Sequence, residues 1–313
     1  NEKFCPPAAA SGVGYGLEPS GDRLTCQLLK PMIDQGWMST HTKNWLDEEE
    51  LGSWSGVKLT AASVGGLEQV QGLDFGGFGI VATMGRLARL FRCLTELNTL
   101  KLSGNTQLEG KLADVADMTA LQVLNLSATK IGGELSATSE LTCLTELVLD
   151  NSLVEGELLD LEFCPWIRVL SLFKTNVEGN IKDLCAFNSL CQLNLGLTQV
   201  EGDLDELGGL TSLTILELDN TDIRGNLESV AGLRSLHALS LASTGIEGEV
   251  SAVAGLTNLR RLNLGITLVS GHISELSTLT ALRCLYIDNT NIRADESDQI
   301  TFAQATGCTD VLV

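Results

Sequence analysis

Few side chains in this sequence have the types and spacing that catalysis requires. The three histidines, His41, His237 and His272, belong to no nucleophile motif. The sequence also contains no glycine-rich phosphate loop and no H-E-x-x-H zinc motif. We therefore expect a protein that is not an enzyme and that needs no cofactor.

One acidic series is regular enough to suggest cation binding. Glu155, Glu178, Glu201 and Glu247 stand at the same point of a repeating unit, and Arg224 interrupts them. Hard cations such as calcium bind clustered carboxylates. However, like charges about 5 Å apart repel only weakly when water and salt screen them. We favour a solvated acidic edge, and we predict no metal site.

The nine cysteines suggest different roles. Cys5 and Cys26 flank a segment rich in Gly, Ala and Pro, and we expect a disulfide between them. Cys164 stands where other units carry Leu or Phe, which predicts a small core residue. Cys143, Cys164 and Cys185 follow at a regular 21-residue interval, which could bring two of them together. A disulfide favours an oxidising compartment.

From Thr119 to Phe302 the sequence is organised by a 23-residue period. Aligned units begin at Thr119, Thr142, Pro165, Asn188, Thr211, Arg234, Thr257 and Thr280, and a longer unit begins at Thr95. Each reads approximately x-x-L-x-x-L-x-L-x-x-T-x-[VI]-x-G-x-[LIV]. Leu216 and Leu218 alternate with Ile215 and Glu217, which predicts one strand per unit in a parallel sheet. A period of this length indicates a solenoid stabilised by stacking of neighbouring units.

A longer period, equal to three units, is superimposed on the first. "LNLGLT" at Leu193 recurs as "LNLGIT" at Leu262, and "LDNTDIR" at Leu218 recurs as "IDNTNIR" at Ile287. Duplication of a block of three units explains this pattern, and a ligand with matching spacing is the alternative.

The repeat resembles the plant-type subclass of leucine-rich repeat proteins. That subclass usually has a proline after G-x-I, which is absent here, and asparagine at a position where this chain has Thr or Ser. The segments "NWL" from Asn44 and "WSGV" from Trp54 resemble the family's N-terminal cap. The family's cysteine after W-x-G-V is missing, because Lys58 and Leu59 follow instead.

The resemblance implies an α/β solenoid, a right-handed coil with a parallel β-sheet on its concave face. We expect an N-terminal arm and helical cap over residues 1–69, about ten coils over residues 70–293, and a short C-terminal cap over residues 294–313.

The column at the usual asparagine position has two interpretations. It consists of Thr129, Ser152, Thr175, Thr198, Thr221, Thr244, Thr267 and Thr290. An exposed threonine ladder could bind ice. Because related repeats place this side chain inward, we prefer buried hydroxyls that bond to the backbone of their own turn and of the next unit.

Outward strand positions can vary without harming the core, so we expect partner contacts there. The candidates form an early apolar group and a late basic group. They are Val148, Phe173, Lys174, Leu197, Arg260, Arg261, Arg283 and Tyr286. The alternative for the arginines is simple pairing with nearby acids such as Asp288.

The net charge of −20 excludes nucleic acid and anionic membranes as the main partners. No run of 18 apolar residues is present, so we expect no transmembrane segment. We therefore predict a module that binds another protein, either as a free module or as a subunit of a multi-subunit complex, in a secreted or organelle-lumen location. The alternatives are an inhibitor of a secreted hydrolase and a protein that binds ice or glycan surfaces.

Overall fold

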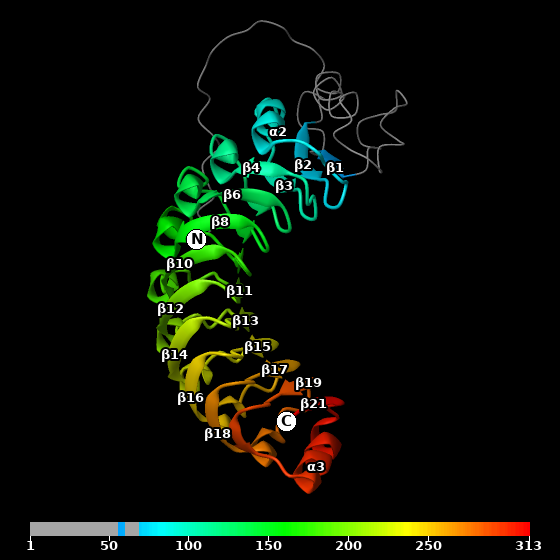
Figure 1. Ribbon diagram of the computed structural model, residues 1–313, viewed down its shortest axis with the longest axis vertical. Coiled ribbons are helices and arrows are strands. Elements are labelled where there is room, and N and C mark those ends of the chain that lie inside the picture. Colours follow the sequence, from blue (N-terminus) through cyan, green and yellow to red (C-terminus); the bar gives the residue numbers. More distant parts are fainter. Residues whose placement is uncertain (1–55, 60–68) are drawn as a thin grey trace, which may run out of the picture. The chain divides into compact units, whose positions relative to one another are not determined.

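The computed structural model describes residues 56–59 and 69–313. Most of the predicted N-terminal cap, and the predicted disulfide between Cys5 and Cys26, lie outside the described residues. The chain divides into two compact units, residues 1–154 and 155–313, and each is described separately (Figure 1).

The first unit contains strands of two sheets. The first sheet holds β1 (Val57–Leu59), β2 (Val70–Asp74), β3 (Thr99–Lys101), β5 (Val123–Asn125) and β7 (Glu146–Val148) in this order. Strand β1 is antiparallel to β2, and the following pairs are parallel. The second sheet contains β4 (Glu109–Lys111) and β6 (Lys130–Glu134). Helix α2 (Met84–Phe91) and the 3₁₀-helices η2 (Leu112–Val115) and η3 (Leu135–Thr138) complete this unit.

The second unit continues the same plan. Its first sheet has the order β9 (Val169–Ser171), β11 (Gln192–Asn194), β13 (Ile215–Glu217), β15 (Ala238–Ser240), β17 (Arg261–Asn263), β19 (Cys284–Tyr286) and β21 (Asp310–Leu312). Its second sheet has the order β8 (Leu153–Glu157), β10 (Asn176–Asn180), β12 (Gln199–Asp203), β14 (Asp222–Asn226), β16 (Gly245–Glu249), β18 (Leu268–His272) and β20 (Asn291–Arg293). The first two residues of β8 belong to the first unit, and Glu155 to Glu157 belong to the second. All these pairs are parallel.

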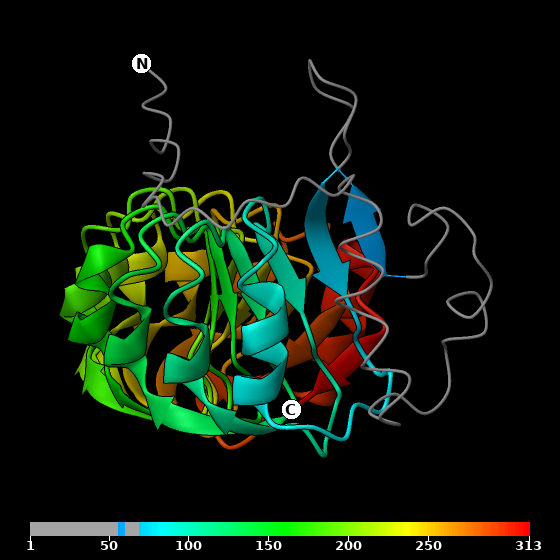
Figure 2. The ribbon, with the colours of Figure 1, turned by 90° about the horizontal axis from the view of Figure 1, so that it is seen from above.

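A 3₁₀-helix follows each second-sheet strand from β8 to β18. These helices are η4 (Leu158–Phe163), η5 (Ile181–Leu184), η6 (Leu204–Leu207), η7 (Leu227–Val230), η8 (Val250–Val253) and η9 (Ile273–Leu276). Figure 2 shows the helical turns on the outer side of the coils. Each coil is thus a first-sheet strand, a tight turn, a second-sheet strand and a short helix.

The second sheet is the main feature that the repeat pattern did not predict. The return path of each coil buries its apolar side chains, as Ile223, Leu227, Val230 and Leu233 show, since all four are fully buried. In addition, Asp222 to Asn226 form a strand that pairs with both neighbouring coils. Gly225 has φ +120, and a Cβ there would lie 2.3 Å from Asp203 Oδ1, so glycine is required at this point.

The predicted strand register is confirmed by burial. Leu216 and Leu218 of β13 are fully buried, whereas Ile215 and Glu217 are half-buried on the opposite side. Leu216 is aligned with Leu193 and Leu239 in the neighbouring strands. A column of leucines therefore fills the core, and each full burial contributes about 1.5–3 kcal/mol.

The threonine column points inward, as predicted, and its hydroxyls bond to their own turns, but among the described residues none bonds to the next unit. Thr129, Thr175, Thr198, Thr221, Thr244 and Thr267 are all buried. In each, Oγ1 donates to the carbonyl three residues earlier, for example from Thr221 to Leu218 at 2.6 Å. Ser152 breaks the pattern, because its buried Oγ has no hydrogen-bond partner among the described residues. The column therefore holds its own turns closed and is no surface for ice.

The residue before each Thr or Ser of this column has a left-handed backbone conformation. Ala128, Asn151, Lys174, Leu197, Asn220, Ser243, Ile266 and Asn289 have φ between 52 and 56. Asparagine tolerates this conformation, whereas leucine and β-branched isoleucine are strained in it. The sequence pattern did not reveal this turn, because so many residue types occupy it.

One asparagine does occupy the inward position, in the longer unit. Asn105 is fully buried, and its Oδ1 accepts from Ile80 N–H at 2.9 Å. Its Nδ2 donates to the carbonyls of Phe75 and Leu102 at 2.9 and 2.7 Å. A single amide therefore satisfies backbone groups of two neighbouring coils, which a threonine hydroxyl in this fold does not do.

The C-terminal residues form a helix and a strand. Helix α3 (Glu296–Thr306) begins at the cap residue Asp295, whose Oδ1 accepts from Asp298 N–H at 2.9 Å. It ends at Gly307, which has φ 73. Strand β21 then pairs with β19 and ends the first sheet of this unit.

Candidate functional site

The term strand face is used below for the outward side chains of the first sheet, the residue directly before each of its strands, and the turn residues up to three positions after each strand. Val148 lies half-buried on β7 of the first unit. The other seven predicted contact residues belong to the second unit. They separate into an apolar group at β9 and β11 and a basic group from β17 to β19.

The apolar group contains an aromatic ring that lies close to a glycine of the next coil. Phe173 follows β9, and a Cβ on Gly196 of the next coil would lie 3.1 Å from its ring. The ring therefore covers Gly196, which is buried. Leu197 is next in the chain and is 43% exposed. Phe173 and Leu197 thus form one small apolar surface, and the exposed Lys174 lies beside them.

Arg261 is part of a polar chain across three strands. Its guanidinium lies 3.3 Å from Glu217 Oε1. Glu217 Oε2 accepts from Asn194 Nδ2 at 2.8 Å. Ala238 is the register partner of Arg261 on the strand between, and its small side chain leaves room for this contact. Arg261 therefore forms the kind of ion pair that was the alternative to partner binding, and the acidic residue in this pair is Glu217, not Asp288.

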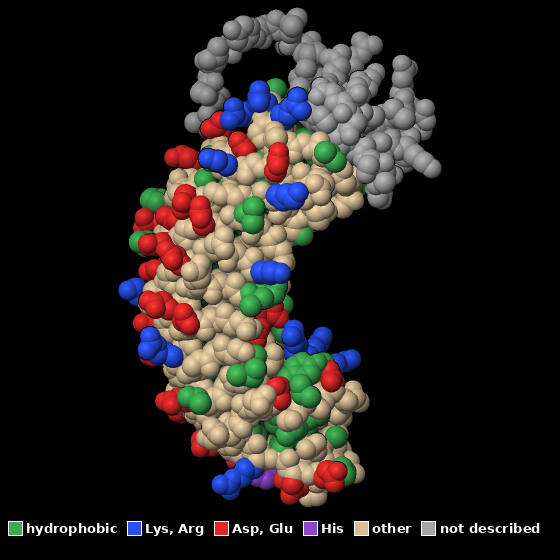
Figure 3. Space-filling view, in the orientation of Figure 1, with side chains coloured by type: hydrophobic (Ala, Val, Ile, Leu, Met, Phe, Trp, Pro, Cys, Tyr) green, Lys and Arg blue, Asp and Glu red, His purple; other side chains and the backbone are tan. Residues whose placement is uncertain are grey.

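Arg260 and Arg283 are arranged differently from Arg261. Arg260 N–H donates to the His237 carbonyl, and Arg283 N–H donates to the Arg260 carbonyl, both at 2.8 Å. The three residues therefore occupy the same position on three consecutive coils, just before β15, β17 and β19. All three side chains are exposed. Figure 3 shows Lys and Arg side chains gathered beside a hydrophobic area in the C-terminal part of the chain.

Tyr286 lies at the end of β19, and its hydroxyl is hydrogen-bonded within the protein. Its hydroxyl donates to Asp310 Oδ2 of β21 at 2.5 Å. This hydrogen bond is the main reason why the pKa of Tyr286 is raised to about 12. Tyr286 therefore joins the last two strands, and it presents a half-buried ring on the strand face.

The longer, three-unit period has a structural counterpart on this face. Asp219 Oδ1 accepts from Ser240 Oγ at 2.5 Å and from Ala242 N–H at 2.9 Å, both on the next coil. In the coil after that, Asn263 Oδ1 accepts from the N–H of Gly265 at 3.2 Å. Asn194 makes the same contact with Gly196, at the corresponding position of the preceding block. The contact made by Asn194 thus recurs three coils later at Asn263.

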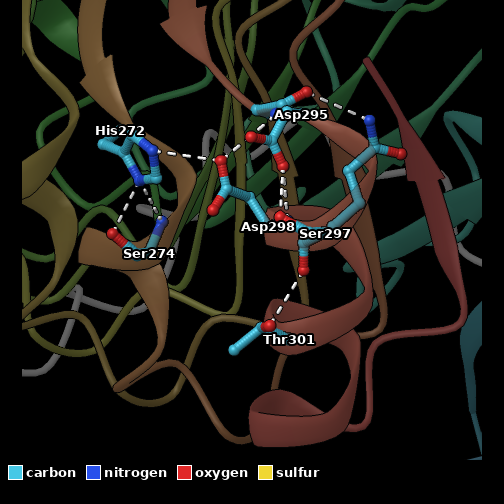
Figure 4. Close-up of polar contacts among 8 residues, drawn as sticks. His272, Ser274, Asp295, Ser297, Asp298 and Thr301 are labelled. Carbon is cyan, nitrogen blue, oxygen red and sulfur yellow. Dashed lines mark hydrogen bonds and ion pairs between the residues drawn. The ribbon is translucent and has the colours of Figure 1, made fainter.

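A Ser–His–Asp cluster at the C-terminal end was not anticipated. His272 Nδ1 lies 2.7 Å from Ser274 Oγ, and Nε2 lies 3.1 Å from Asp298 Oδ2 (Figure 4). The same Nδ1 accepts from Ser274 N–H at 3.3 Å, so the imidazole caps η9. Asp298 Oδ2 also accepts from Asp295 N–H at 3.2 Å. The hydrogen bonds from Ser297 and Asp298 lower the pKa of Asp295. This cluster joins the last coil to α3, and its contacts are those of helix caps.

The acidic series lies on the second sheet, away from the strand face. Glu155, Glu178, Glu201 and Glu247 are exposed outward residues of β8, β10, β12 and β16. Within residues 56–59 and 69–313, no group of three His, Cys, Asp or Glu side chains is arranged to hold a metal ion. Over the same ranges, no helix is both long enough and apolar enough to cross a membrane.

The regular spacing of three cysteines does not produce a disulfide among them. Cys143 is disulfide-bonded, but neither Cys164 nor Cys185 belongs to a disulfide, so Cys143 pairs with neither. Their spacing is slightly shorter than one coil and therefore out of phase with it, so Cys164 is buried and Cys185 is exposed. The prediction that Cys164 is a small core residue is confirmed.

The fold has many relatives among solved structures. The chain is similar to the leucine-rich repeat ectodomain of the Arabidopsis thaliana membrane receptor kinase GASSHO1/SCHENGEN3, solved with CASPARIAN STRIP INTEGRITY FACTOR 2. The TM-score is 0.71 and the identity 22%, over 94% of this chain and 35% of that one. For the Arabidopsis receptor kinase HAESA ectodomain with an IDA peptide hormone, the TM-score is 0.70 and the identity 21%, over 87% and 48% of the two chains.

A third similar structure is a plant ice-binding protein. Its TM-score is 0.71 and its identity 19%, over 88% of this chain and 89% of that chain. In contrast, this chain spans only about a third to a half of the receptor ectodomains. No protein-family model and no curated protein sequence matches the chain.

These similarities, together with the parallel sheets and the repeat, show a leucine-rich repeat solenoid. The fold is one whose solved examples include an ectodomain in complex with a peptide hormone ligand. At this level of identity they define the architecture of this chain, and its function must be argued from its own side chains.

Proposed function

We propose that this protein is a non-enzymatic module that binds another protein through the strand face of its second unit. The apolar pair Phe173 and Leu197 would supply packed contact area, and Lys174, Arg260, Arg283 and Tyr286 would supply polar contacts. Arg261 would act indirectly, because it is already paired with Glu217. Val148 is the corresponding candidate in the first unit.

The observation that carries this proposal is the strained, exposed Leu197. A left-handed leucine costs about 1–2 kcal/mol, and the same position is Asn in other coils such as Asn220. The side chain is also exposed beside an aromatic ring that is fixed over Gly196. Local rules of folding are broken here without a gain in the core, and such places are often contact sites.

We further propose a secreted or organelle-lumen location, and a role as a free module or as a subunit of a larger assembly. The support is that the similar solved structures include ectodomains of membrane receptors. A protein partner also suits a face that mixes an aromatic ring, an aliphatic side chain and arginines, since such residues are enriched where proteins meet.

The alternatives have less support. Ice binding would need a regular exposed face, and the threonine column cannot provide it because its hydroxyls are buried in their own turns. Inhibition of a secreted hydrolase would use the same strand face, so it is one form of the proposed protein binding and not a separate site.

The proposal is tested by affinity capture from the native source, followed by binding kinetics with the captured protein. Phe173→Ala should raise the dissociation rate by about tenfold or more and change the association rate little, since packed aromatic residues act as hot spots. Phe163→Ala is the matched control, because Phe163 is 52% exposed but lies on η4. Equal dissociation rates for the two variants would remove the strand face from the proposal.

A further inference from the structure

The strand face carries a short row of cationic side chains within a strongly acidic protein. We define the cationic row as His237, Arg260 and Arg283, which precede β15, β17 and β19. Backbone hydrogen bonds link each residue to the next, so the spacing along the row is about 4.8 Å. The row is therefore rigid at its base, and its three side chains extend into solvent.

The composition around the row differs from that of the rest of the chain. Residues 229–287 contain four arginines and three glutamates, with Glu228 and Asp288 directly outside this range, whereas the whole protein has a net charge of −20. Of these glutamates, Glu247 and Glu249 belong to β16 of the second sheet and Glu275 belongs to η9. None of the three belongs to a first-sheet strand.

The carboxylates that do lie on these first-sheet strands already form ion pairs or hydrogen bonds within the protein. Glu217 of β13 contacts both Asn194 and Arg261. Asp310 of β21 accepts the hydroxyl of Tyr286. Arg261 therefore neutralises Glu217, and Asp310 is hydrogen-bonded to Tyr286, which leaves the positive potential of Arg260 and Arg283 available for an external anion.

We propose that the cationic row binds an extended acidic segment of a partner protein. In an extended chain, side chains on one face recur about every 6.6 Å. Two acidic residues separated by one other residue can thus reach Arg260 and Arg283, whose long stems absorb the small difference in spacing. Arginine suits this role because its planar fork binds a carboxylate through two N–H groups.

The same observations favour a protein segment over a long polyanion. The row offers only two guanidinium groups and one imidazole, and the exposed glutamates of the second sheet would repel a uniformly charged polymer. A protein can restrict its acidic residues to the few that meet the row. Tyr286 and Leu312 are register partners on β19 and β21. The half-buried ring of Tyr286 and the exposed side chain of Leu312 can contact an apolar residue next to these acids.

The inference rests on the proposed protein-binding function, but it can be tested without the native partner. The probe is a fluorescent peptide of eight Glu-Gly units, with a peptide of eight Gln-Gly units as its uncharged match. Binding is measured by fluorescence anisotropy at low and at physiological ionic strength. The Glu peptide should bind, the Gln peptide should not, and added salt should weaken the binding because the contacts are exposed.

Variants locate the binding to the row. Arg260→Gln and Arg283→Gln should each lower the affinity about three- to fivefold at low salt, the range for one exposed ion pair. The double variant should lower it about tenfold or more. The matched control is Arg224→Gln, because Arg224 is an exposed arginine on β14 of the second sheet. Circular dichroism melting should be the same for all these variants.

Each remaining outcome would overturn the inference. These outcomes are no binding of the Glu peptide, equal binding to the double variant, or an equal loss with Arg224→Gln. If a sulfated oligosaccharide of the same charge binds tenfold more tightly than the Glu peptide, the ligand of the row is a polysaccharide and not an acidic protein segment. If a native partner is captured equally by wild type and double variant, the row is not its site, yet protein binding stands. If wild type captures nothing, the proposed function fails independently.

Discussion

The contact between Asp219 and the next coil allows a quantitative test of how the coils are joined. Asp219 Oδ1 accepts from Ser240 Oγ and from Ala242 N–H at 2.5 and 2.9 Å. Ser240 is only 1% exposed, so water cannot readily replace the lost acceptor. Asp219→Ala removes both bonds and leaves the hydroxyl without its partner.

The size of the effect follows from these two bonds. A hydrogen bond to a charged acceptor contributes about 1.5–3 kcal/mol, and Asp219 is half-buried, which lowers each contribution toward the lower end. We therefore expect Asp219→Ala to lower the free energy of unfolding by about 2–4 kcal/mol. The double variant Asp219→Ala with Ser240→Ala should recover about 1 kcal/mol, because no buried hydroxyl then lacks an acceptor.

The assay is urea denaturation followed by circular dichroism, with the four proteins of the double-mutant cycle. Asp222→Ala is the control, since Asp222 is an exposed aspartate of β14, and it should change stability by less than about 0.5 kcal/mol. Additive effects of Asp219→Ala and Ser240→Ala would refute the reasoning, because two residues that share a buried hydrogen bond must be coupled.

Two further predictions concern the core and the last strands. Leu218→Ala should lower the free energy of unfolding by about 2–5 kcal/mol, because Leu218 is fully buried, and a loss below about 0.5 kcal/mol would show that the strand register is wrong. The chain has two tyrosines, Tyr15 and Tyr286, and the phenolate absorbance of Tyr286 should appear only near pH 12. Because its pKa is raised in the folded state, its contribution to stability is complete below about pH 10 and is lost as the pH rises toward 12. Asp310→Asn should shift this absorbance to lower pH, and an unchanged titration curve would contradict the assigned hydrogen bond.

Most of one coil could be derived from the sequence. Alternation around Leu216 and Leu218 is a local signal, since consecutive residues of a strand point to opposite sides. The regular repeat then implies that every unit contains this strand. The inward threonine column could also be derived, because a hydroxyl three residues after a buried Leu can reach the carbonyl of its own turn.

The second sheet lay beyond that reasoning for a physical reason. Each of its strands has the pattern x-[VI]-x-G-x, in which only one position is consistently apolar. A single buried residue such as Ile223 is compatible with a loop as well as with a strand. The backbone pairing between β12, β14 and β16 exists only once the coils are stacked.

The candidate site divides in the same way. Outward positions such as Phe173, Arg260 and Tyr286 follow from the strand period alone. The sequence does not show which arginine is available for a partner. Arg261 contacts Glu217, which is 44 residues away in sequence, across the small side chain of Ala238. His272, Ser274 and Asp298 likewise meet only where α3 packs on the last coil. Local periodicity determined the coil and its faces, while the side-chain partners were decided by stacking, since residues far apart in sequence become neighbours only in the folded chain.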